Sequence, residues 1–485
     1  MVFDSLYRIL NDNQEVLMNS RQVFNPFLPS WEYIPDGEPH IFGDRLYLFG
    51  SHDRFNGTQF CMNDYVCWSC PVEDLSEWRP EGTIYRKEQD PAAREDSIMQ
   101  APDVCRGPDG RYYLYYTLGM APFMSVAVCD TPAGKYEYYG TVDYPDNTPV
   151  GCRKYDLFQF DPGVFVDDDG RIWLYSGFGV PEGGPFAEFS KKYMLDGAYC
   201  MELDSDMRTL RSGPRKIFTK KGDHGFYEAS SMRKINGKYY FIYSSVQQHE
   251  LCWAVGERPD GPFAYGGTLV SNGDLGISDS MQNYIGNTHG SVVQVGDAWY
   301  VFYHRQTNCH QFSRQACAER IRFEDGCFHQ AEMTSCGLNN HPLPGMGEYE
   351  ARIACHLWSK KGALSYGLTE TPEAFAHPYF TQSGVDRECS GDQYIANLRE
   401  GATAGYKYFE FDNLKKTGVL VNGHGKGEIV ATLNHGVEVI CRIALDATDK
   451  QKWFYAETER ISGVHALYLT YNGTGYINLH RICFQ

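Results

Sequence analysis

The sequence lacks the features that mark nucleic-acid-binding and membrane-spanning proteins. It holds 62 acidic against 44 basic residues, a formal net charge of −18, so it offers no basic stripe to a phosphate backbone. None of its apolar runs approaches the roughly 18 residues that a membrane helix needs. We therefore expect neither nucleic acid nor a membrane as a partner.

Targeting and zinc-binding signals are equally scarce. The opening residues, MVFDSLYRILNDNQEVLMNSRQ, contain no basic segment followed by an apolar run, so we expect no signal peptide and a cytoplasmic location. In that compartment the 16 cysteines should be free thiols. Cys67 and Cys70 form a C-x-x-C pair. No second pair or histidine follows at zinc spacing, which favours a structural role over a zinc or redox site.

Aromatic residues and glycine, by contrast, are abundant. The 485 residues include 35 Tyr, 28 Phe and 49 Gly. This composition is typical of all-β proteins, because rings suit a pleated sheet and glycine suits tight turns. The length allows two or three domains. Aromatic rings also stack on the apolar faces of sugars, although most of these rings must serve as strand and core material.

An internal repeat is the most informative feature. Five short segments share a turn residue followed by alternating aromatic and aliphatic residues, and they recur every 60 to 67 residues. They are DRLYLF (44–49), GRYYLY (110–115), GRIWLY (170–175), GKYYFI (237–242) and DAWYVF (297–302). The spacing accommodates a four-stranded antiparallel sheet. Five such sheets around an axis form a five-bladed β-propeller, whose core comes from stacking the blades.

A second short apolar segment precedes each repeat across a turn and predicts the innermost strand of its blade. These five segments begin with polar residues, namely Asp36, Asp103, Asp161, Glu228 and His289. Repeat symmetry places them around one end of the central channel, where converging carboxylates shift each other's pKa. Any single one could be a turn cap, and for Asp103 the alternative is that it caps the strand end or orients a neighbour. Five at equivalent positions indicate a functional site.

At these segments the sequence resembles glycoside hydrolase family 43, the inverting arabinofuranosidases and β-xylosidases built on a five-bladed propeller. The resemblance covers roughly residues 24–325. PDGEPHIFGDRLYLFGSHD (35–53) resembles the family's first-blade segment, which implies that Asp36 is the general base. FDPGVFVDDDGRIWLYSG (160–177) and YEASSMRKINGKYYFIYS (227–244) resemble the third and fourth blades. They imply that Asp161 modulates the pKa of the acid and that Glu228 is the general acid.

The resemblance implies further site residues. In NTHGSVVQVGDAWYVFYHR (287–305), His289 resembles the axial histidine associated with a bound calcium ion, and Arg305 resembles the arginine that reaches the sugar in some members. Asp103 and Trp31 are also predicted to bind substrate. Trp31 is a candidate sugar platform, with packing inside a blade as the alternative.

The sequence departs from the family pattern at three places. Gly37 follows the base where the family usually has Pro, and Ala229-Ser230 follows the acid where it often has Gly-Pro. Gln100 stands where the family often has Trp. The carboxylates keep their register, so the departures bear on the shape of the sugar pocket and on the substrate.

Four segments are predicted along the chain. They are an N-terminal extension at 1–23, the propeller at 24–325, a connecting segment at 326–349 and a β-sandwich at 350–485. Short apolar runs between turn residues recur through the last segment at sandwich spacing. Within it, YIANLREGATAGYKYFEF (394–411) and GVHALYLTYNGTGYINLHRICF (463–484) resemble a carbohydrate-binding module of family 6.

Together these features predict an inverting, exo-acting glycoside hydrolase that acts on plant-type or related glycans. The expected activity is that of an α-L-arabinofuranosidase and/or a β-D-xylosidase, with an oligosaccharide or glycoside as substrate. Inversion needs an acid and a base on opposite sides of the anomeric carbon, and Asp36 and Glu228 lie on non-adjacent blades. The alternatives are a propeller glycosidase or phosphorylase of other specificity and a non-catalytic carbohydrate-binding propeller. A WMNDPNG-like fructosidase motif, WD40 signatures and a basic phosphate cluster beside the motifs are all missing.

Overall fold

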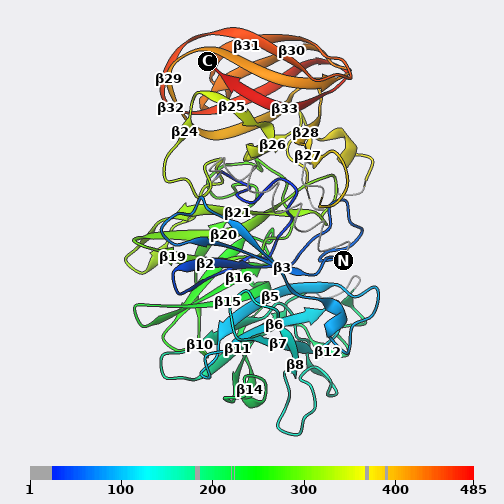
Figure 1. Cartoon of the computed structure of the whole chain (residues 1–485), viewed down its shortest axis with the longest axis vertical. Helices are drawn as coiled ribbons and strands as arrows, with labels where there is room; N and C mark the ends of the chain where they lie inside the picture. Colours follow the sequence, from blue (N-terminus) through cyan, green and yellow to red (C-terminus); the bar gives the residue numbers. More distant parts are fainter. Residues whose placement is uncertain (1–23, 181–185, 220, 223, 366–370, 388–391) are drawn as a thin grey trace.

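The computed structural model describes residues 24–180, 186–219, 221–222, 224–365, 371–387 and 392–485. The predicted extension at 1–23 lies outside the described residues. Five antiparallel sheets surround a central axis, and a large sheet lies beyond them in the C-terminal part of the chain (Figure 1). The prediction of an all-β fold, a five-bladed propeller followed by a sandwich, is confirmed. Among the described helices, none has the length and apolar character to cross a membrane.

Each blade is a meander of consecutive antiparallel strands, four in blades 1 to 4 and three in blade 5. The strands are, in blade 1, β1 (Glu38–Phe42), β2 (Arg45–Phe49), β3 (Tyr65–Pro71) and β4 (Arg79–Tyr85); in blade 2, β5 (Met99–Arg106), β6 (Tyr112–Leu118), β7 (Met124–Cys129) and β8 (Glu137–Thr141); in blade 3, β10 (Gly163–Val166), β11 (Ile172–Phe178), β13 (Gly197–Leu203) and β14 (Leu210–Thr219); in blade 4, β15 (Phe226–Ile235), β16 (Lys238–Ser245), β17 (Leu251–Gly256) and β18 (Ala264–Val270); and in blade 5, β19 (Ser291–Val295), β20 (Ala298–Gln306) and β21 (Arg314–Ile321). The five repeat segments form the second strands, β2, β6, β11, β16 and β20. The upstream segments form the inner strands β1, β5, β10, β15 and β19, as predicted.

Short elements accompany the main sheets. Around the blades they are the parallel pair β9 (Asp156–Leu157) and β12 (Tyr193–Met194), the hairpin β22 (Phe323–Glu324) and β23 (Cys327–Phe328), and the 3-10 turn η1 (Lys87–Gln89). Between strands of the C-terminal sheet they are the 3-10 turns η3 (Ala351–Ile353), η5 (Ala374–Ala376) and η6 (Asn434–Gly436).

The core of the propeller lies between neighbouring blades. In the described residues, each adjacent pair of blades encloses its own apolar cluster. The cluster that closes the ring joins blade 5 to blade 1, where Phe302 and Val293 lie with Leu46 and Trp68. A blade cannot bury both of its faces alone, so stacking five of them supplies the core and holds the inner strands around one axis.

Glycines allow the inner strands to lie unusually close to their neighbours. A Cβ at Gly163 would lie 2.4 Å from the carbonyl oxygen of Ser230 in blade 4, and a Cβ at Gly290 would lie 1.9 Å from that of Phe302. Real Cβ atoms do not approach so closely. Gly290 also forms a parallel bridge with Gly37, which joins the entries of the inner strands of blades 5 and 1.

The C-terminal part folds into one ten-stranded sheet. Its strands are β24 (Leu343–Pro344), β25 (Gly347–Glu350), β26 (His356–Trp358), β27 (Tyr379–Gln382), β28 (Gln393–Leu398), β29 (Ala402–Gly423), β30 (Lys426–Leu433), β31 (Glu438–Asp446), β32 (Lys452–Thr474) and β33 (Ile477–Phe484). Strands from both ends of the sheet contribute to a single buried core, including Phe380 of β27 and Ile440 of β31. The sheet therefore folds over itself, as a sandwich does (Figure 1).

Blade strands run from Glu38 to Ile321, and the large sheet runs from Leu343 to Phe484. The domain limits at 325 and 349 stay predictions.

Candidate active site

Three of the five predicted polar residues stand at the same place in their blades. Asp36, Asp161 and His289 each lie two residues before the inner strand of blades 1, 3 and 5. The two aspartates have left-handed backbone, with φ of 57° and 45°. This conformation is uncommon away from glycine, and it recurs at functional sites because the surrounding structure holds it in place.

Asp36 is held by Arg314 at the first residue of β21. Arg314 Nη1 lies 2.8 Å from Asp36 Oδ1, while the same guanidinium makes a two-pronged contact with Asp53 at 2.8 and 3.0 Å. The backbone N–H of Asp36 donates to His304 Nδ1 at 3.1 Å. Burial opposes ionisation of Asp36, but the charge of Arg314 and the neighbouring imidazoles lower its pKa. Asp36 is therefore an ionised carboxylate in a buried site.

Asp161, in blade 3, contacts residues of blades 4 and 5. Its Oδ2 accepts the backbone N–H of Ala229 at 3.2 Å and stands 3.5 Å from Nδ1 of His289. The same His289 nitrogen lies 3.9 Å from Asp36 Oδ1, so one imidazole contacts both carboxylates. Burial lowers the pKa of His289 to about 4, which keeps the ring neutral.

Glu228 is presented by an irregular stretch of β15. The strand register shifts on both sides of this residue, and Ala229 has a φ of 69°. A bulge of this kind turns a side chain out of the regular pleat. Burial and then the negative charge of Asp36 raise the pKa of Glu228 to about 8. Glu228 is therefore a protonated acid near neutral pH.

The charge that raises the pKa of Glu228 differs from the one expected. The sequence suggested repulsion by an ionised Asp161, whereas the structure gives burial first and Asp36 second. Burial, with Glu228 and Asp36 nearby, raises the pKa of Asp161 itself well above its usual range. Of Asp36, Asp161 and Glu228, only Asp36 accepts a hydrogen bond from the guanidinium of Arg314, so Asp36 carries the negative charge of these three acids.

Asp103 joins three blades. Its Oδ1 lies 2.7 Å from His40 Nε2 of blade 1, and its Oδ2 accepts the backbone N–H of Val164 in blade 3 at 2.7 Å. Both oxygens are engaged within the protein. This arrangement matches the alternative in which Asp103 orients its neighbours.

Comparison with known proteins decides the family. A family model described as glycosyl hydrolases family 43 matches residues 33–328. A xylosidase/arabinosidase of Thermoclostridium stercorarium is 47% identical over 477 residues, which cover 95% of this chain and 98% of the relative. The chain belongs to glycoside hydrolase family 43.

Solved family 43 structures share the fold. An arabinoxylan arabinofuranohydrolase from Bacillus subtilis in complex with cellotetraose is 19% identical, covers 96% of this chain and 98% of its own, and has a TM-score of 0.50. A β-xylosidase/α-arabinofuranosidase from a compost microbial metagenome, in complex with xylotriose and in a calcium-free form, is 24% identical. That match covers 64% of this chain and 97% of the other, with a TM-score of 0.51.

Arg305 does not contact the carboxylates, contrary to the expectation that it reaches the sugar. Its Nη1 donates to the carbonyl oxygen of Ala354 at 2.9 Å, and its guanidinium lies 3.8 Å from the ring centroid of Phe380. Successive side chains of a strand point to opposite faces. Since His304 faces Asp36, Arg305 faces the C-terminal part of the chain. Arg314, which the sequence analysis missed, is the arginine that contacts Asp36.

Trp31 is also placed differently from an open sugar platform. Its side chain is only 6% exposed and belongs to the core between blades 5 and 1, with the ring of Trp68 at 6.0 Å. The need for a cation among converging acids is the one signal that could have pointed to Arg314. No comparable signal separated Trp31 from the core.

A hard cation fits the axis beside His289. Nε2 of His289 and Oε1 of Glu38 lie 4.0 Å apart, and both are buried without a hydrogen-bond partner. Glu38 Oε2, by contrast, accepts hydrogen bonds from Arg233 and Ser231 at 2.9 and 3.0 Å. A hydrated calcium ion would satisfy both orphaned atoms, because Glu38 can ligate it directly and His289 can bind one of its waters.

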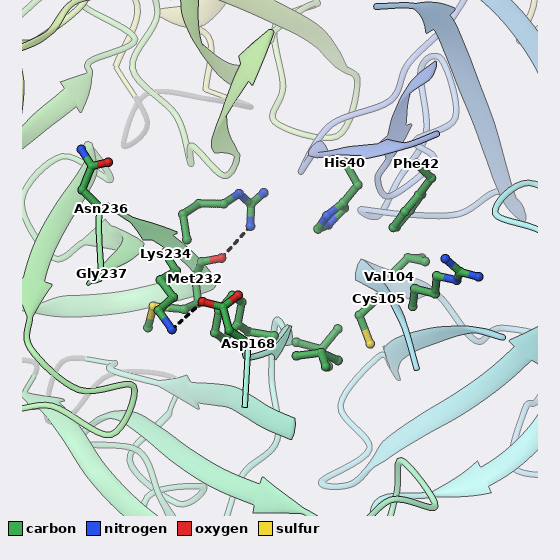
Figure 2. Close-up of a pocket in the computed structure, with 14 residues that line it drawn as sticks. His40, Phe42, Val104, Cys105, Asp168, Met232, Lys234, Asn236 and Gly237 are labelled. Carbon is green, nitrogen blue, oxygen red and sulfur yellow. Dashed lines mark hydrogen bonds and ion pairs between the residues drawn. The ribbon is translucent and has the colours of Figure 1, made fainter. Parts of the chain in front are cut away.

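The opposite end of the channel holds a cavity of about 530 Å³. Residues from the far ends of the inner strands line it, including His40, Val104 and Lys234 (Figure 2). Its lining carboxylate, Asp168, is paired with Lys234 at 2.9 Å. Asp36 and Glu228 are not among the residues that line this cavity.

Proposed function

We propose that this family 43 enzyme releases terminal α-L-arabinofuranosyl and/or β-D-xylosyl residues from plant-type glycans with inversion of configuration. Asp36 acts as general base, Glu228 as general acid and Asp161 as modulator. The observation that carries the assignment is the separation of two pKa values within one cluster. Arg314 keeps Asp36 ionised while burial keeps Glu228 protonated, and such a pair assigns base and acid.

In this mechanism each group has one proton to move. Glu228 donates its proton to the glycosidic oxygen as the bond to the anomeric carbon breaks. Asp36 accepts a proton from the water that attacks the opposite face of that carbon. Asp161, held by the N–H of Ala229, adjusts the pKa of Glu228 and positions the sugar.

The relative that spans the chain supports the sugar specificity. The Thermoclostridium stercorarium protein is described as a xylosidase/arabinosidase, and a Humicola insolens relative, 30% identical over 310 residues, carries a similar description. A panel of nitrophenyl glycosides led by α-L-arabinofuranoside and β-D-xyloside tests this specificity. Turnover of neither would overturn it, and turnover that requires phosphate would favour a phosphorylase.

Proton NMR of the first-formed sugar tests the stereochemistry. Inversion predicts initial release of the anomer opposite to that of the substrate. Release of the same anomer would show retention. A leaving-group series tests the acid, because Glu228→Ala should abolish turnover of poor leaving groups and spare activated aryl glycosides. Equal loss on both substrates would remove Glu228 from that role.

The axial calcium ion is part of the proposal. Glu38 and His289 would hold it, and it would offset the negative charge of the cluster. Metal analysis should find about one calcium per chain, and chelation should lower the melting temperature. A metal-free protein whose melting temperature ignores the chelator would contradict it.

Two further proposals concern the rest of the chain. The C-terminal sheet serves as a carbohydrate-binding module, a role supported by its sandwich arrangement. The protein is cytoplasmic, a location supported by the free thiols of all cysteines in the described residues. Sugar titration of an inactive variant and cell fractionation test these two proposals.

A further inference from the structure

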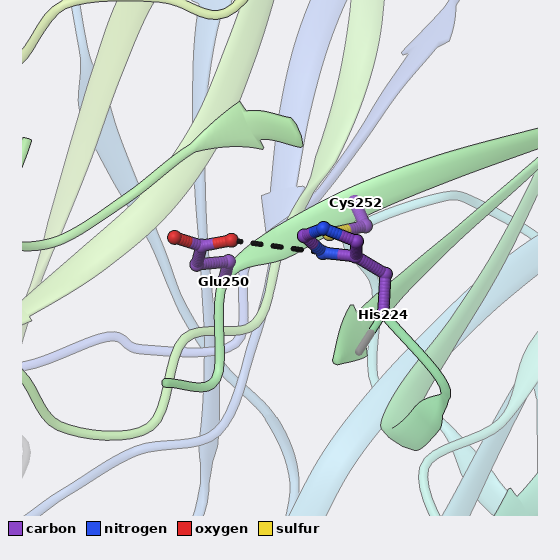
Figure 3. Close-up of side chains that lie close together, drawn as sticks. All are labelled: His224, Glu250 and Cys252. Atoms are coloured by element: carbon purple, nitrogen blue, oxygen red, sulfur yellow. Dashed lines mark ion pairs between the residues drawn. The ribbon is translucent and has the colours of Figure 1, made fainter. Parts of the chain in front are cut away.

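A second cluster of reactive side chains lies in blade 4, apart from the acid and base. His224 precedes β15, Glu250 precedes β17, and Cys252 is the second residue of β17. Their side chains converge (Figure 3). One imidazole nitrogen, one carboxylate oxygen and the thiol sulfur all lie within 4.8 Å of one another. The mechanism proposed above uses none of the three.

The distances suit a small divalent ion. His224 Nδ1 and Glu250 Oε2 lie 3.9 Å apart. Zinc bonds of about 2.0–2.3 Å place tetrahedral ligands about 3.3–3.8 Å from one another. A closing movement of less than about 1 Å therefore brings the three atoms to bonding distance. Rotation about side-chain bonds is enough for a movement of this size.

His224 offers an unused nitrogen. Its Nδ1 is buried and makes no hydrogen bond. The ring cannot turn freely, because it stacks on Tyr265 with centroids 4.3 Å apart and an interplanar angle of 7°. A buried polar atom without a partner is destabilising. A metal ion between His224 and Glu250 would satisfy this nitrogen.

The Cys252 thiol is protonated without a metal. Burial and the charge of Glu250 raise the pKa of the thiol to about 12, and burial raises the pKa of Glu250 above its usual value. A divalent ion displaces the thiol proton, because it favours the thiolate over the thiol. Binding of the ion to Cys252 therefore releases a proton.

We propose that His224, Glu250 and Cys252 form a binding site for one borderline divalent cation of the zinc type. The donor set of one nitrogen, one oxygen and one sulfur fits zinc, whereas calcium and magnesium take oxygen ligands. Three protein ligands leave the fourth position open to water. This site is separate from the axial position between Glu38 and His289.

The site is connected to the general acid by a single step along the chain. Glu250 follows His249, whose Nδ1 lies 3.9 Å from Glu228 Oε1 and whose ring lies 4.5 Å from that of Tyr227. An ion bound to Glu250 fixes the turn between β16 and β17. It thereby also fixes His249, which lies beside Glu228. The site would thus tune Glu228 without touching the substrate.

Cobalt titration of the chelator-stripped full chain tests the proposal without measuring activity. The parent for this experiment carries Cys152→Ser and Cys327→Ser, which remove the two thiols that are exposed in the described part of the chain. One equivalent of Co²⁺ should produce a thiolate-to-cobalt absorption band, and Zn²⁺ should displace it while Ca²⁺ does not. Zn²⁺ should also raise the melting temperature, because it binds only the folded chain.

Three variants and a matched control locate the site. Cys252→Ser should abolish the band, and His224→Gln and Glu250→Gln should weaken Co²⁺ binding roughly tenfold or more. Cys200→Ser should change nothing, since Cys200 is a buried thiol on the third strand of blade 3 and pairs with Tyr175 as Cys252 pairs with Tyr243. Glu250→Gln keeps the thiol, so it decides the matter if Cys252→Ser fails to fold.

The proposal is overturned if the parent shows no band, or if the band survives Cys252→Ser. It is also overturned if binding by Glu250→Gln equals that of the parent. None of these readouts depends on turnover, so they stand apart from any failure of the glycosidase assignment.

Discussion

Two clusters of buried charge in this molecule differ in how their charges are satisfied. One lies at the end of the propeller axis and contains Asp36, Asp161 and Glu228. The other lies between blade 5 and the C-terminal sheet, around Asp274. Asp36, Asp161 and Asp274 are all at most 5% exposed, so burial alone does not separate a reactive site from a structural one.

In the cluster around Asp274, each partner of the carboxylate donates a hydrogen bond to it. Asp274 accepts from His356 Nε2 at 2.7 Å, from Lys407 Nζ at 3.0 Å and from the backbone N–H of Met333 at 2.8 Å. Lys407 also contacts Glu332 at 2.8 Å. Burial opposes ionisation of Asp274, but the hydrogen bond from His356 and the charge of Lys407 lower its pKa. Asp274 therefore stays ionised at neutral pH and holds two parts of the fold together.

At the axis only one of the three acids contacts the guanidinium of Arg314. Arg314 contacts Asp36, while Glu228 and Asp161 lack such a contact, and burial raises their pKa values. The difference between the clusters is therefore the ratio of donors to acids. A deficit of donors leaves protons that can be exchanged near neutral pH, and this property is what acid–base catalysis needs.

The largest expected effect is the loss of turnover in Asp36→Asn. The amide cannot accept a proton from water, so kcat should fall by about 10²–10⁴-fold, the usual contribution of a general base. The melting temperature should change little, because Asp53 still holds Arg314. Steady-state kinetics on the best aryl glycoside and a thermal melt measure both. A kcat within tenfold of the parent would contradict the assignment of Asp36 as base.

Asp274→Ala should produce the opposite pattern. It leaves Lys407 and His356 buried without their acid, and breaking such a group typically destabilises a fold by about 3–5 kcal/mol. The folded fraction should keep its kcat, because Asp274 does not contact the axial acids in the described structure. Urea unfolding and active-site-normalised kinetics at low temperature measure the two quantities. A stable variant with lowered kcat would break the comparison.

The pH dependence of stability should separate the two clusters by sign. The pKa of Glu228 is raised to about 8 in the folded chain, so its favourable contribution is present below about pH 4.5 and is lost as the pH rises towards 8. Glu228→Gln should therefore gain stability over the parent between these values, by at least about 1 kcal/mol.

Asp274 has a lowered pKa, so its contribution is present above its unfolded value and disappears as the pH falls through the folded one. The destabilisation of Asp274→Asn should accordingly shrink in acid. Denaturant unfolding measured from acid to about pH 8 gives the pH dependence of the unfolding free energy for both residues. If that free energy changed with pH in the same direction for Glu228 and for Asp274, the distinction between the clusters would be refuted. In the same range kcat/KM should fall as the pH rises through about 8, where Glu228 loses its proton.

The sequence predicted the parts of the site that depend on repeat symmetry. The spacing of the five segments placed Asp36, Asp161 and His289 at equivalent points because the blades stack around one axis. It could not show that Ala229 adopts a left-handed φ and that β15 bulges on both sides of Glu228. It could not separate Arg305 from Arg314 either, since both are buried arginines of blade 5. Which one meets the acids depends on strand alternation and on the partner across the sheet.

The smallest expected effect concerns Arg305. It decides whether this arginine reaches the sugar, as the sequence suggested, or only packs against Ala354 and Phe380, as in the structure. Arg305 makes one hydrogen bond to Ala354 and stacks on Phe380, while Nε and Nη2 are buried without partners, and burial lowers its pKa to about 10. Arg305→Met keeps most of the apolar volume. The lost cation–π contact, about 0.5–1 kcal/mol, is offset by removal of a poorly satisfied charge. Stability should therefore change by less than about 1 kcal/mol, and KM should stay within about twofold of the parent because the side chain faces away from Asp36.

Arg314→Met is the matched comparison and should lose activity, since it removes the cation that keeps Asp36 ionised. A KM that rises tenfold in Arg305→Met, with Arg314→Met unaffected, would return the sugar contact to Arg305 and exchange the roles of the two arginines.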